Sequence, residues 1–165
     1  MTDDMLRALS KNGGVVMINY NAGFLSEEFR AATRSPELNA RIQAANKQCA
    51  GDEACTIREG ERINHEAMMT GELPKVTWDK IIEHIDHAVK VAGIDHVGLG
   101  SDFDGAVMPL GMEDVSKLPK ITDALLKKGY AERDIQKILG ENILRVMEQV
   151  ERIASSGGKG GSQSR

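Results

Sequence analysis

The chain is 165 residues long, typical of a single domain, and its 25 acidic and 21 basic side chains give a net charge of −4. This negative balance, with no cluster of Lys and Arg to offset it, argues against a nucleic-acid partner. No apolar run is long enough to span a membrane, and the first residues lack the pattern of a secretion signal. Aromatic residues make up only 4% of the chain, so the core must be built from aliphatic side chains.

A helix followed by a strand is predicted at the start of the chain. Thr2 can cap the helix, and an Asn-Gly pair can end it. Residues 14–19 are apolar without polar alternation, which predicts a buried strand. Asn19 and Tyr20 follow at its carboxyl end, where α/β enzymes place polar groups of a site.

Residues 22–74 are polar and helix-prone, with only scattered apolar positions, and predict one or two exposed helices inserted after the first strand. His65 lies there alone and is expected to be a surface histidine. Cys49 and Cys55 lie close enough in sequence to form a small disulfide loop in an oxidising compartment, or to remain free thiols. The sequence leaves both states, and therefore the compartment, open.

The next predicted helix covers residues 77–92 and buries an aliphatic face. His84 and His87 are three residues apart and could share a face of it. They lack the intervening glutamate of zinc-binding helices, so a metal site is not expected.

An apolar strand follows and ends in Ser101-Asp102-Phe103-Asp104-Gly105, which is the most informative segment of the chain. If the strand continued, Asp102 and Asp104 would point the same way, because side chains alternate along a strand. The alternative is an Asp-Gly turn that follows the strand.

Three helices are predicted after this segment, at 116–129, 131–139 and 141–153. In the last helix the apolar positions expected to face inward are Ile143, Leu144, Met147 and Val150. The Gly/Ser-rich tail at 155–165 is expected to be disordered. Residues 1–154 are therefore expected to form the folded part, with 22–74 as a helical insert.

Strands that alternate with helices indicate an α/β fold with a parallel sheet. Only two strands are predicted here, and two parallel strands leave both outer edges unpaired and cannot close a barrel. Either strands are missed, or the chain is part of a larger domain.

The Asp102-Phe103-Asp104-Gly105 turn also matches the nucleophile turn of aspartyl phosphatases, in which a strand ends in Asp-x-Asp-Gly. Only helices are predicted after Asp104, and Ala106 stands where those enzymes usually have Thr. This interpretation is therefore a minor alternative.

From residue 1 to residue 153 the sequence resembles the carboxyl-terminal part of the membrane (renal-type) dipeptidases, peptidase family M19. Three stretches carry the resemblance, in the order of the family. They are Thr2 to Leu6 with Gly14 to Tyr20, Val97 to Gly105 with Gly111 to Ser116, and Gly140 to Val146.

The resemblance implies the carboxyl-terminal portion of a (β/α)8 barrel whose binuclear zinc site hydrolyses dipeptides. Asp102 matches the aspartate at the end of the last strand, which is expected to orient the attacking hydroxide or the substrate and to carry a proton to the leaving amine. The resemblance makes Asp104 a weaker substrate-binding candidate, and Asn19 and Tyr20 are expected to line the pocket.

The zinc ligands of the family are a His-x-Asp pair, a bridging Glu and two later His residues, all of which precede the matched region. None of His65, His84, His87 and His96 lies in such a motif, so no metal ligand is assigned to this chain. The chain alone is therefore expected to lack dipeptidase activity and to need the missing N-terminal half of the barrel.

The alternative is a non-catalytic remnant or interaction module that covers its sheet edges by self-association, as a homo-oligomer or an aggregate. Members of the family are often exported, which suggests a periplasmic, secreted or membrane-associated parent enzyme. The localisation of this chain is left open.

Overall fold

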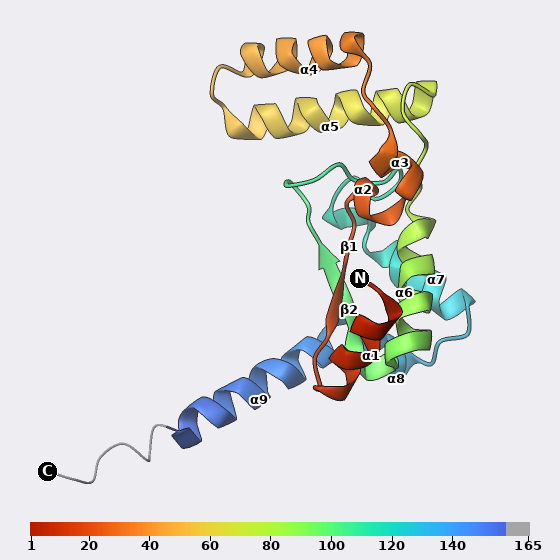
Figure 1. Cartoon of the computed structure of the whole chain (residues 1–165), viewed down its shortest axis with the longest axis vertical. Coiled ribbons are helices and arrows are strands. Elements are labelled where there is room, and N and C mark those ends of the chain that lie inside the picture. The colour runs from red at the N-terminus through yellow and green to blue at the C-terminus, as the bar shows by residue number, and fades with distance from the viewer. Residues whose placement is uncertain (158–165) are drawn as a thin grey trace, which may run out of the picture. The chain divides into compact units, whose positions relative to one another are not determined.

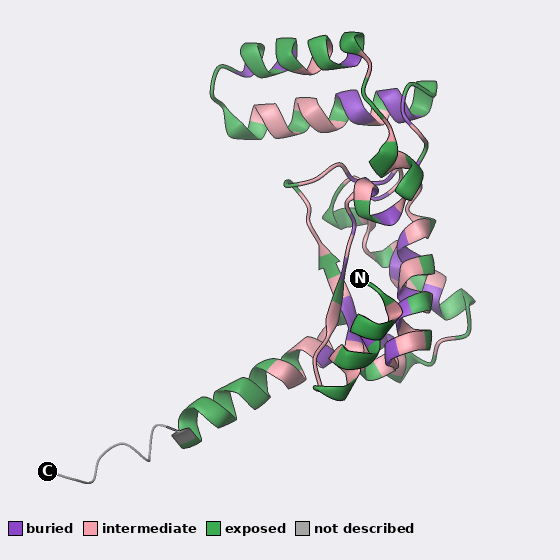
Figure 2. Cartoon of the chain, viewed as in Figure 1, coloured by how far each residue is buried: buried purple, intermediate pink, exposed green. Residues whose placement is uncertain are grey.

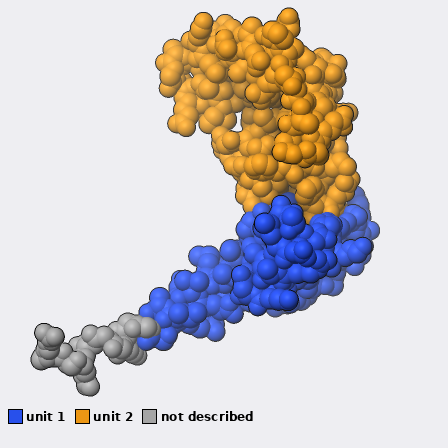
Figure 3. Space-filling model, in the orientation of Figure 1, with its two compact units in different colours: residues 1–18, 85–99, 125–165 blue, residues 19–84, 100–124 orange. Residues whose placement is uncertain are grey.

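The computed structural model describes residues 1–157 as an α/β fold made mostly of helices (Figure 1). The chain divides into two compact units (Figure 3). Residues 1–18, 85–99 and 125 onward form the first unit, and residues 19–84 and 100–124 form the second. No helix in the described part of the chain is long and apolar enough to cross a bilayer.

Two strands, β1 (Val16–Asn19) and β2 (Val97–Ser101), pair as a parallel sheet, which confirms the predicted pair. At the carboxyl end of the pair, the Tyr20 N–H donates to the Ser101 carbonyl at 2.7 Å. The sheet has two strands within residues 1–157. The ends of β1 and β2 therefore lie side by side, and the residues that follow them are neighbours.

The helices of the first unit surround an aliphatic core, as the composition predicted. The unit contains α1 (Asp3–Lys11), η1 (Ile94–His96), α8 (Glu132–Gln136), η3 (Lys137–Glu141) and α9 (Asn142–Gly157), with the last part of α6 (Asp79–Ala92) and the end of α7 (Pro119–Lys127). Its buried side chains include Leu6, Ile85, Ala88, Val97, Leu125, Ile135 and Ile138. Thr2 caps α1 as predicted, since its Oγ1 accepts from the Met5 N–H at 3.4 Å.

The second unit holds the segment predicted as an insert. Four helices lie there, where one or two were predicted: α2 (Ala22–Leu25), α3 (Glu27–Ala31), α4 (Pro36–Cys49) and α5 (Glu53–Thr70). A short turn, η2 (Val115–Lys117), precedes α7. An isolated parallel bridge joins Thr77 and Leu110. The helices predicted after residue 76 are present as α6, as η2 with α7, as α8 with η3, and as α9.

Helices α4 and α5 lie side by side as a hairpin (Figure 1). A disulfide between Cys49 and Cys55 closes its tip, which resolves the alternatives that the sequence left open. The hairpin is not simply exposed, because one face of each helix is buried (Figure 2). The buried side chains are Leu38, Ala45 and Cys49 on α4 and Ile63, Asn64, Ala67 and Met68 on α5.

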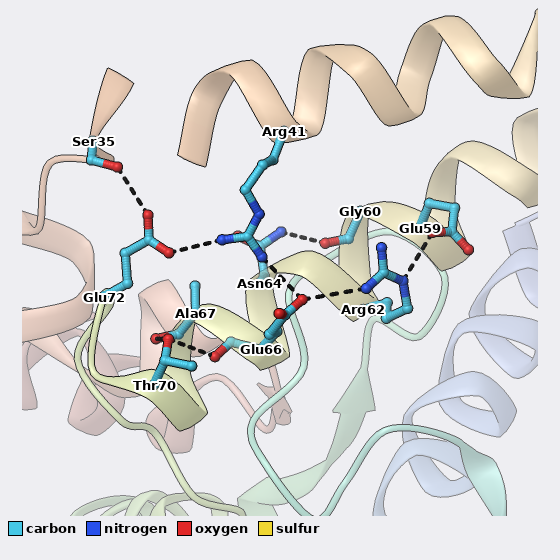
Figure 4. Close-up of polar contacts among 10 residues, drawn as sticks. All are labelled: Ser35, Arg41, Glu59, Gly60, Arg62, Asn64, Glu66, Ala67, Thr70 and Glu72. Carbon is cyan, nitrogen blue, oxygen red and sulfur yellow. Dashed lines mark hydrogen bonds and ion pairs between the residues drawn. The ribbon is translucent and has the colours of Figure 1, made fainter. Parts of the chain in front are cut away.

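Ion pairs join α4 to α5 and to the residues after α5, at the end of the hairpin opposite the disulfide (Figure 4). Arg41 on α4 contacts Glu66 on α5 and Glu72 beyond it, both at 3.0 Å. Ser35 also donates to Glu72, at 2.9 Å. The cross-links at both ends of the hairpin hold α4 against α5.

The last helix, α9, differs from its prediction in two ways. Leu144, Met147 and Val150 were predicted to face inward but are more than half exposed. An apolar stripe predicts a buried face only where a partner is present to cover it. The helix also includes residues 155–157, which were assigned to the tail. The remainder of the predicted disordered tail, 158–165, lies outside the described residues.

Candidate functional site

The chain leaves β2 through a turn with an unusual backbone. Ser101, Asp102 and Asp104 have φ values of 53°, 95° and 64°, in the left-handed region that favours glycine. The Gly105 N–H donates to the Asp102 carbonyl at 3.3 Å and closes the turn. The strand therefore ends at Ser101, so the turn interpretation holds and the alternation of a continuing strand does not.

Asp102 is half-buried at the end of β2 and bound to the end of β1. The Asn19 Nδ2 donates to Asp102 Oδ2 at 2.9 Å. Asn19 Oδ1 accepts from the Asn21 N–H at 2.8 Å, so both ends of this amide are engaged. A Cβ at Gly105 would lie 3.0 Å from Asp102 Oδ1, so glycine there leaves room for the carboxylate. The structure thus brings together two of the predicted site residues, Asn19 and Asp102.

Asp104 is exposed and belongs to a different environment from Asp102. Its carboxylate repels the negative charge of Glu61 on α5. The Glu61 Oε1 is buried without a hydrogen-bond partner among residues 1–157. Burial is the main cause that raises the pKa of Glu61; the His65 imidazole opposes the rise and the Asp104 carboxylate adds to it. The two aspartates of the turn therefore have different neighbours, Asn19 for Asp102 and Glu61 for Asp104.

An open acidic cleft of about 750 Å³ lies beside Asp104 within the second unit. Six carboxylates and one guanidinium are among its lining side chains: Asp52, Glu53, Glu61, Asp104, Glu113, Asp114 and Arg58. Several of these carboxylates already accept hydrogen bonds from nearby backbone N–H groups. Asp52 caps α5 by accepting the Cys55 N–H at 3.0 Å, and Asp114 accepts the Ser116 N–H at 2.8 Å. Hydrogen bonding to the Ser116 side chain, and then to its backbone N–H, lowers the pKa of Asp114.

Tyr20 is fully buried, although the sequence predicted that it lines a pocket. Its ring packs edge-to-face on Phe103, with 5.8 Å between the ring centroids. Its hydroxyl finds no hydrogen-bond partner within residues 1–157, and burial raises the pKa of the phenol. In this chain Tyr20 has no surface that a ligand in solvent could reach.

Each histidine is bound through a ring nitrogen to a nearby oxygen. The partners are the Met108 carbonyl for His65 (2.9 Å), the Leu25 carbonyl for His84 (3.2 Å), Asp3 Oδ1 for His87 (2.8 Å) and the Gly14 carbonyl for His96 (2.7 Å). His65, predicted to be a surface histidine, is half-buried. No group of three or more His, Cys, Asp or Glu side chains within residues 1–157 could hold a metal ion. The donor set of the described residues therefore does not fit a metal site.

Sequence reasoning missed Glu61 and the cleft around it. Residues 54, 57, 58 and 61 follow one another at helical spacing, which is a signal for one face of α5. Nothing local shows that the loop at 104 and the loop at 113–114 approach this face. Long-range contacts of this kind have no periodic signature in a single sequence.

Solved structures define the class of this fold. A metallopeptidase from Rhodobacter sphaeroides, solved with a phosphinate mimic of the dipeptide L-Ala-D-Ala, is similar at a TM-score of 0.59 with 27% identity. That match covers 90% of this chain and 30% of the metallopeptidase. The dipeptidase AC of family M19 gives the same TM-score with 28% identity, covering 90% of this chain and 32% of that one. The fold is therefore similar to that of M19 dipeptidase structures.

The family is identified by its model. The model of the membrane dipeptidases, peptidase family M19, matches residues 1–159, so the chain belongs to this family. This confirms the resemblance that the sequence motifs indicated.

Two curated fungal relatives agree with this assignment. Dipeptidase ataJ of Aspergillus terreus is 32% identical over 155 residues, and dipeptidase tcpJ of Claviceps purpurea is 42% identical over 83 residues. These matches cover 93% and 50% of this chain. The chain spans only 27% and 20% of the lengths of these two relatives.

Proposed function

We propose that this chain is the carboxyl-terminal portion of a zinc-dependent dipeptidase and that Asp102 is its catalytic carboxylate. The observation that carries this proposal is the hydrogen bond between Asn19 and Asp102, at the edge where β1 and β2 both end. Catalytic groups of α/β enzymes lie at this edge of the sheet. Membership of the M19 family supplies the reaction class, the hydrolysis of dipeptides.

In this proposal β1 and β2 are two adjacent strands of a (β/α)8 barrel. The outer edge of each strand would pair with strands supplied by the rest of the enzyme, since this chain covers about 30% of the solved relatives. The N-terminal half of the barrel is thus the first partner that we propose, and a dipeptide is the substrate.

Within that enzyme Asp102 would take up and release a proton at the scissile amide. Its carboxylate is half-buried and held in one orientation, which a general acid–base residue needs. Asp104, exposed in the same turn, would attract the ammonium group of the substrate. We propose that zinc ligands come from outside residues 1–157.

The chain alone is expected to be inactive. A positioned carboxylate contributes about 10²–10⁴-fold to a reaction rate, whereas enzymes typically reach about 10⁶-fold or more. The described residues hold no cluster of three or more metal-ligating side chains that would supply the difference.

Reconstitution tests the role of Asp102. The chain would be co-expressed with the N-terminal portion of an M19 dipeptidase in zinc-containing medium, and dipeptide hydrolysis would be measured. We expect activity with the unchanged chain and a loss of about 10²-fold or more in kcat with Asp102→Asn. Asp123→Asn, an exposed change on α7, serves as the matched control and should leave kcat unchanged. Equal activity of the Asp102→Asn and control variants would remove Asp102 from the mechanism.

A second candidate function is a non-catalytic, self-associating chain. The apolar exposed face of α9 favours it, together with the two-stranded sheet that residues 1–157 leave without a third strand. Analytical ultracentrifugation separates the two candidates. A stable dimer that remains inactive in the reconstitution would support this function, whereas a monomer would argue against it.

A further inference from the structure

The turn that carries Asp102 adopts a conformation that its own residues do not favour. Ser101, Asp102 and Asp104 all have positive φ values, and none is a glycine. Such conformations persist only where surrounding contacts hold them, and they cluster at functional sites. The contacts that hold this turn therefore bear on how Asp102 is presented.

Two consecutive residues at the end of β1 supply these contacts. The Tyr20 N–H donates to the Ser101 carbonyl at 2.7 Å, and Asn19 Nδ2 donates to Asp102 Oδ2 at 2.9 Å. The Tyr20 ring meets the Phe103 ring edge-to-face. Three successive residues of the turn are each held by Asn19 or Tyr20.

Neither residue is arranged to bind a ligand. The Asn19 amide has both ends engaged, with Asp102 and with the Asn21 N–H, and has little hydrogen-bonding capacity left for a substrate. Tyr20 is fully buried, and its hydroxyl is unpaired within residues 1–157. Its contribution to the turn comes from its ring and its backbone.

We infer that Asn19 is the positioning residue of the Asp102 carboxylate and that Tyr20 supports the strained turn through packing, so that neither contacts substrate. This differs from the pocket-lining role that the sequence suggested for both. Any effect on catalysis rests on the proposed function, whereas the structural pairing of Asn19 with Asp102 does not.

A charge-swap series on the whole 165-residue chain tests the pairing. Asn19→Asp places two carboxylates face to face and should lower the urea midpoint. The double variant Asn19→Asp/Asp102→Asn restores one amide and one carboxylate across the same gap and should recover most of the loss. Asn46→Asp adds the same charge on the exposed face of α4 and should leave the midpoint unchanged. If Asn19→Asp matches this control, or if the double variant does not recover, the pairing is wrong.

Tyr20 is tested by removing its hydroxyl and its ring separately. Tyr20→Phe keeps the ring and should keep or raise the urea midpoint, because a buried unpaired hydroxyl is lost. Tyr20→Ala removes the ring and should lower the midpoint. A lower midpoint for Tyr20→Phe would show that the hydroxyl has a partner and would overturn its assignment to packing alone.

Kinetics in the reconstituted enzyme distinguish positioning from substrate binding. For a positioning residue, Asn19→Ala should lower kcat about 10-fold or more with KM changed less than about 3-fold; a rise in KM at constant kcat would instead assign Asn19 to substrate binding. The double variant should regain stability but not activity, because its carboxylate lies at position 19. If it regains both, the pairing stands and the catalytic role proposed for Asp102 fails.

Discussion

The side-chain amide of Asn142 donates to the Val97 carbonyl at 2.9 Å and to the Ile94 carbonyl at 2.7 Å. Asn142 is the first residue of α9 and is almost fully buried. One amide therefore joins the start of the last helix to the start of β2. Buried backbone carbonyls that lose such a donor cannot form a replacement hydrogen bond with water.

Replacing Asn142 should therefore destabilise the first unit. We expect Asn142→Ala to lower the free energy of unfolding by about 2–3 kcal/mol, from two lost hydrogen bonds and the carbonyls left unpaired. Urea unfolding followed by circular dichroism measures the change. Asn46→Ala, at an exposed position of α4, is the control and should cost nothing. Equal midpoints for the two variants would show that the Asn142 amide is not a cross-link.

The disulfide between Cys49 and Cys55 should stabilise the α4–α5 hairpin modestly, because it closes a short loop. Replacing both cysteines by alanine should cost about 2 kcal/mol in the chain-entropy model for a loop of this size. Hydrogen exchange of the α4 and α5 amides, with and without a reductant, would report the loss. Unchanged protection in the reduced chain would contradict a stabilising bond. The double alanine variant controls for effects of the reductant, because it has no disulfide to reduce.

Glu61 should make the chain less stable as the pH rises. Burial raises the pKa of Glu61 in the folded state above its ordinary value of 4.5. The folded chain therefore holds this proton more tightly, so the stability that it contributes is full below pH 4.5 and is lost as the pH rises through the raised pKa. Urea midpoints between pH 4 and about pH 7.5 should fall less for Glu61→Gln than for the unchanged chain. Identical slopes for the two chains would show that Glu61 titrates normally.

The exposed face of α9 should tolerate polar substitution. Met147 and Val150 are 53% and 61% exposed, so changing either to Gln should alter the free energy of unfolding by less than about 0.5 kcal/mol. Ile138, which is fully buried in the same unit, is the comparison, and Ile138→Ala should cost about 2–5 kcal/mol. A large cost at Met147 would mean that this face is covered in solution.

The parts of the fold that could be predicted depend on local or strictly periodic signals. Thr2 was predictable as the cap of α1, because a threonine side chain can accept a hydrogen bond from one of the first N–H groups of a helix and two acidic residues follow it. Asn19 and Asp102 could be expected as neighbours, because Asn19 ends β1, Asp102 follows β2, and parallel strands end at one edge of a sheet.

What could not be predicted depends on contacts between distant segments. Asp102 has a positive φ although it is not a glycine, and its contacts with the end of β1 come from residues more than eighty positions earlier in the chain. Glu61 is half-buried near a loop that is distant in sequence. Leu144 has the spacing of a core residue but is exposed. Whether such a residue is buried depends on a partner surface that covers it, and the spacing of apolar residues does not show whether that surface is present.

Dipeptide hydrolysis by the purified 165-residue chain, with and without added zinc, tests the central proposal most directly. Because residues 1–157 contain no cluster of three or more His, Cys, Asp or Glu side chains that could hold a metal ion, we expect no turnover above the blank at any zinc concentration, and turnover only when the N-terminal portion of an M19 dipeptidase is added. Turnover by the isolated chain that appears with zinc and disappears with a chelator would contradict the proposal that the metal ligands lie outside these residues.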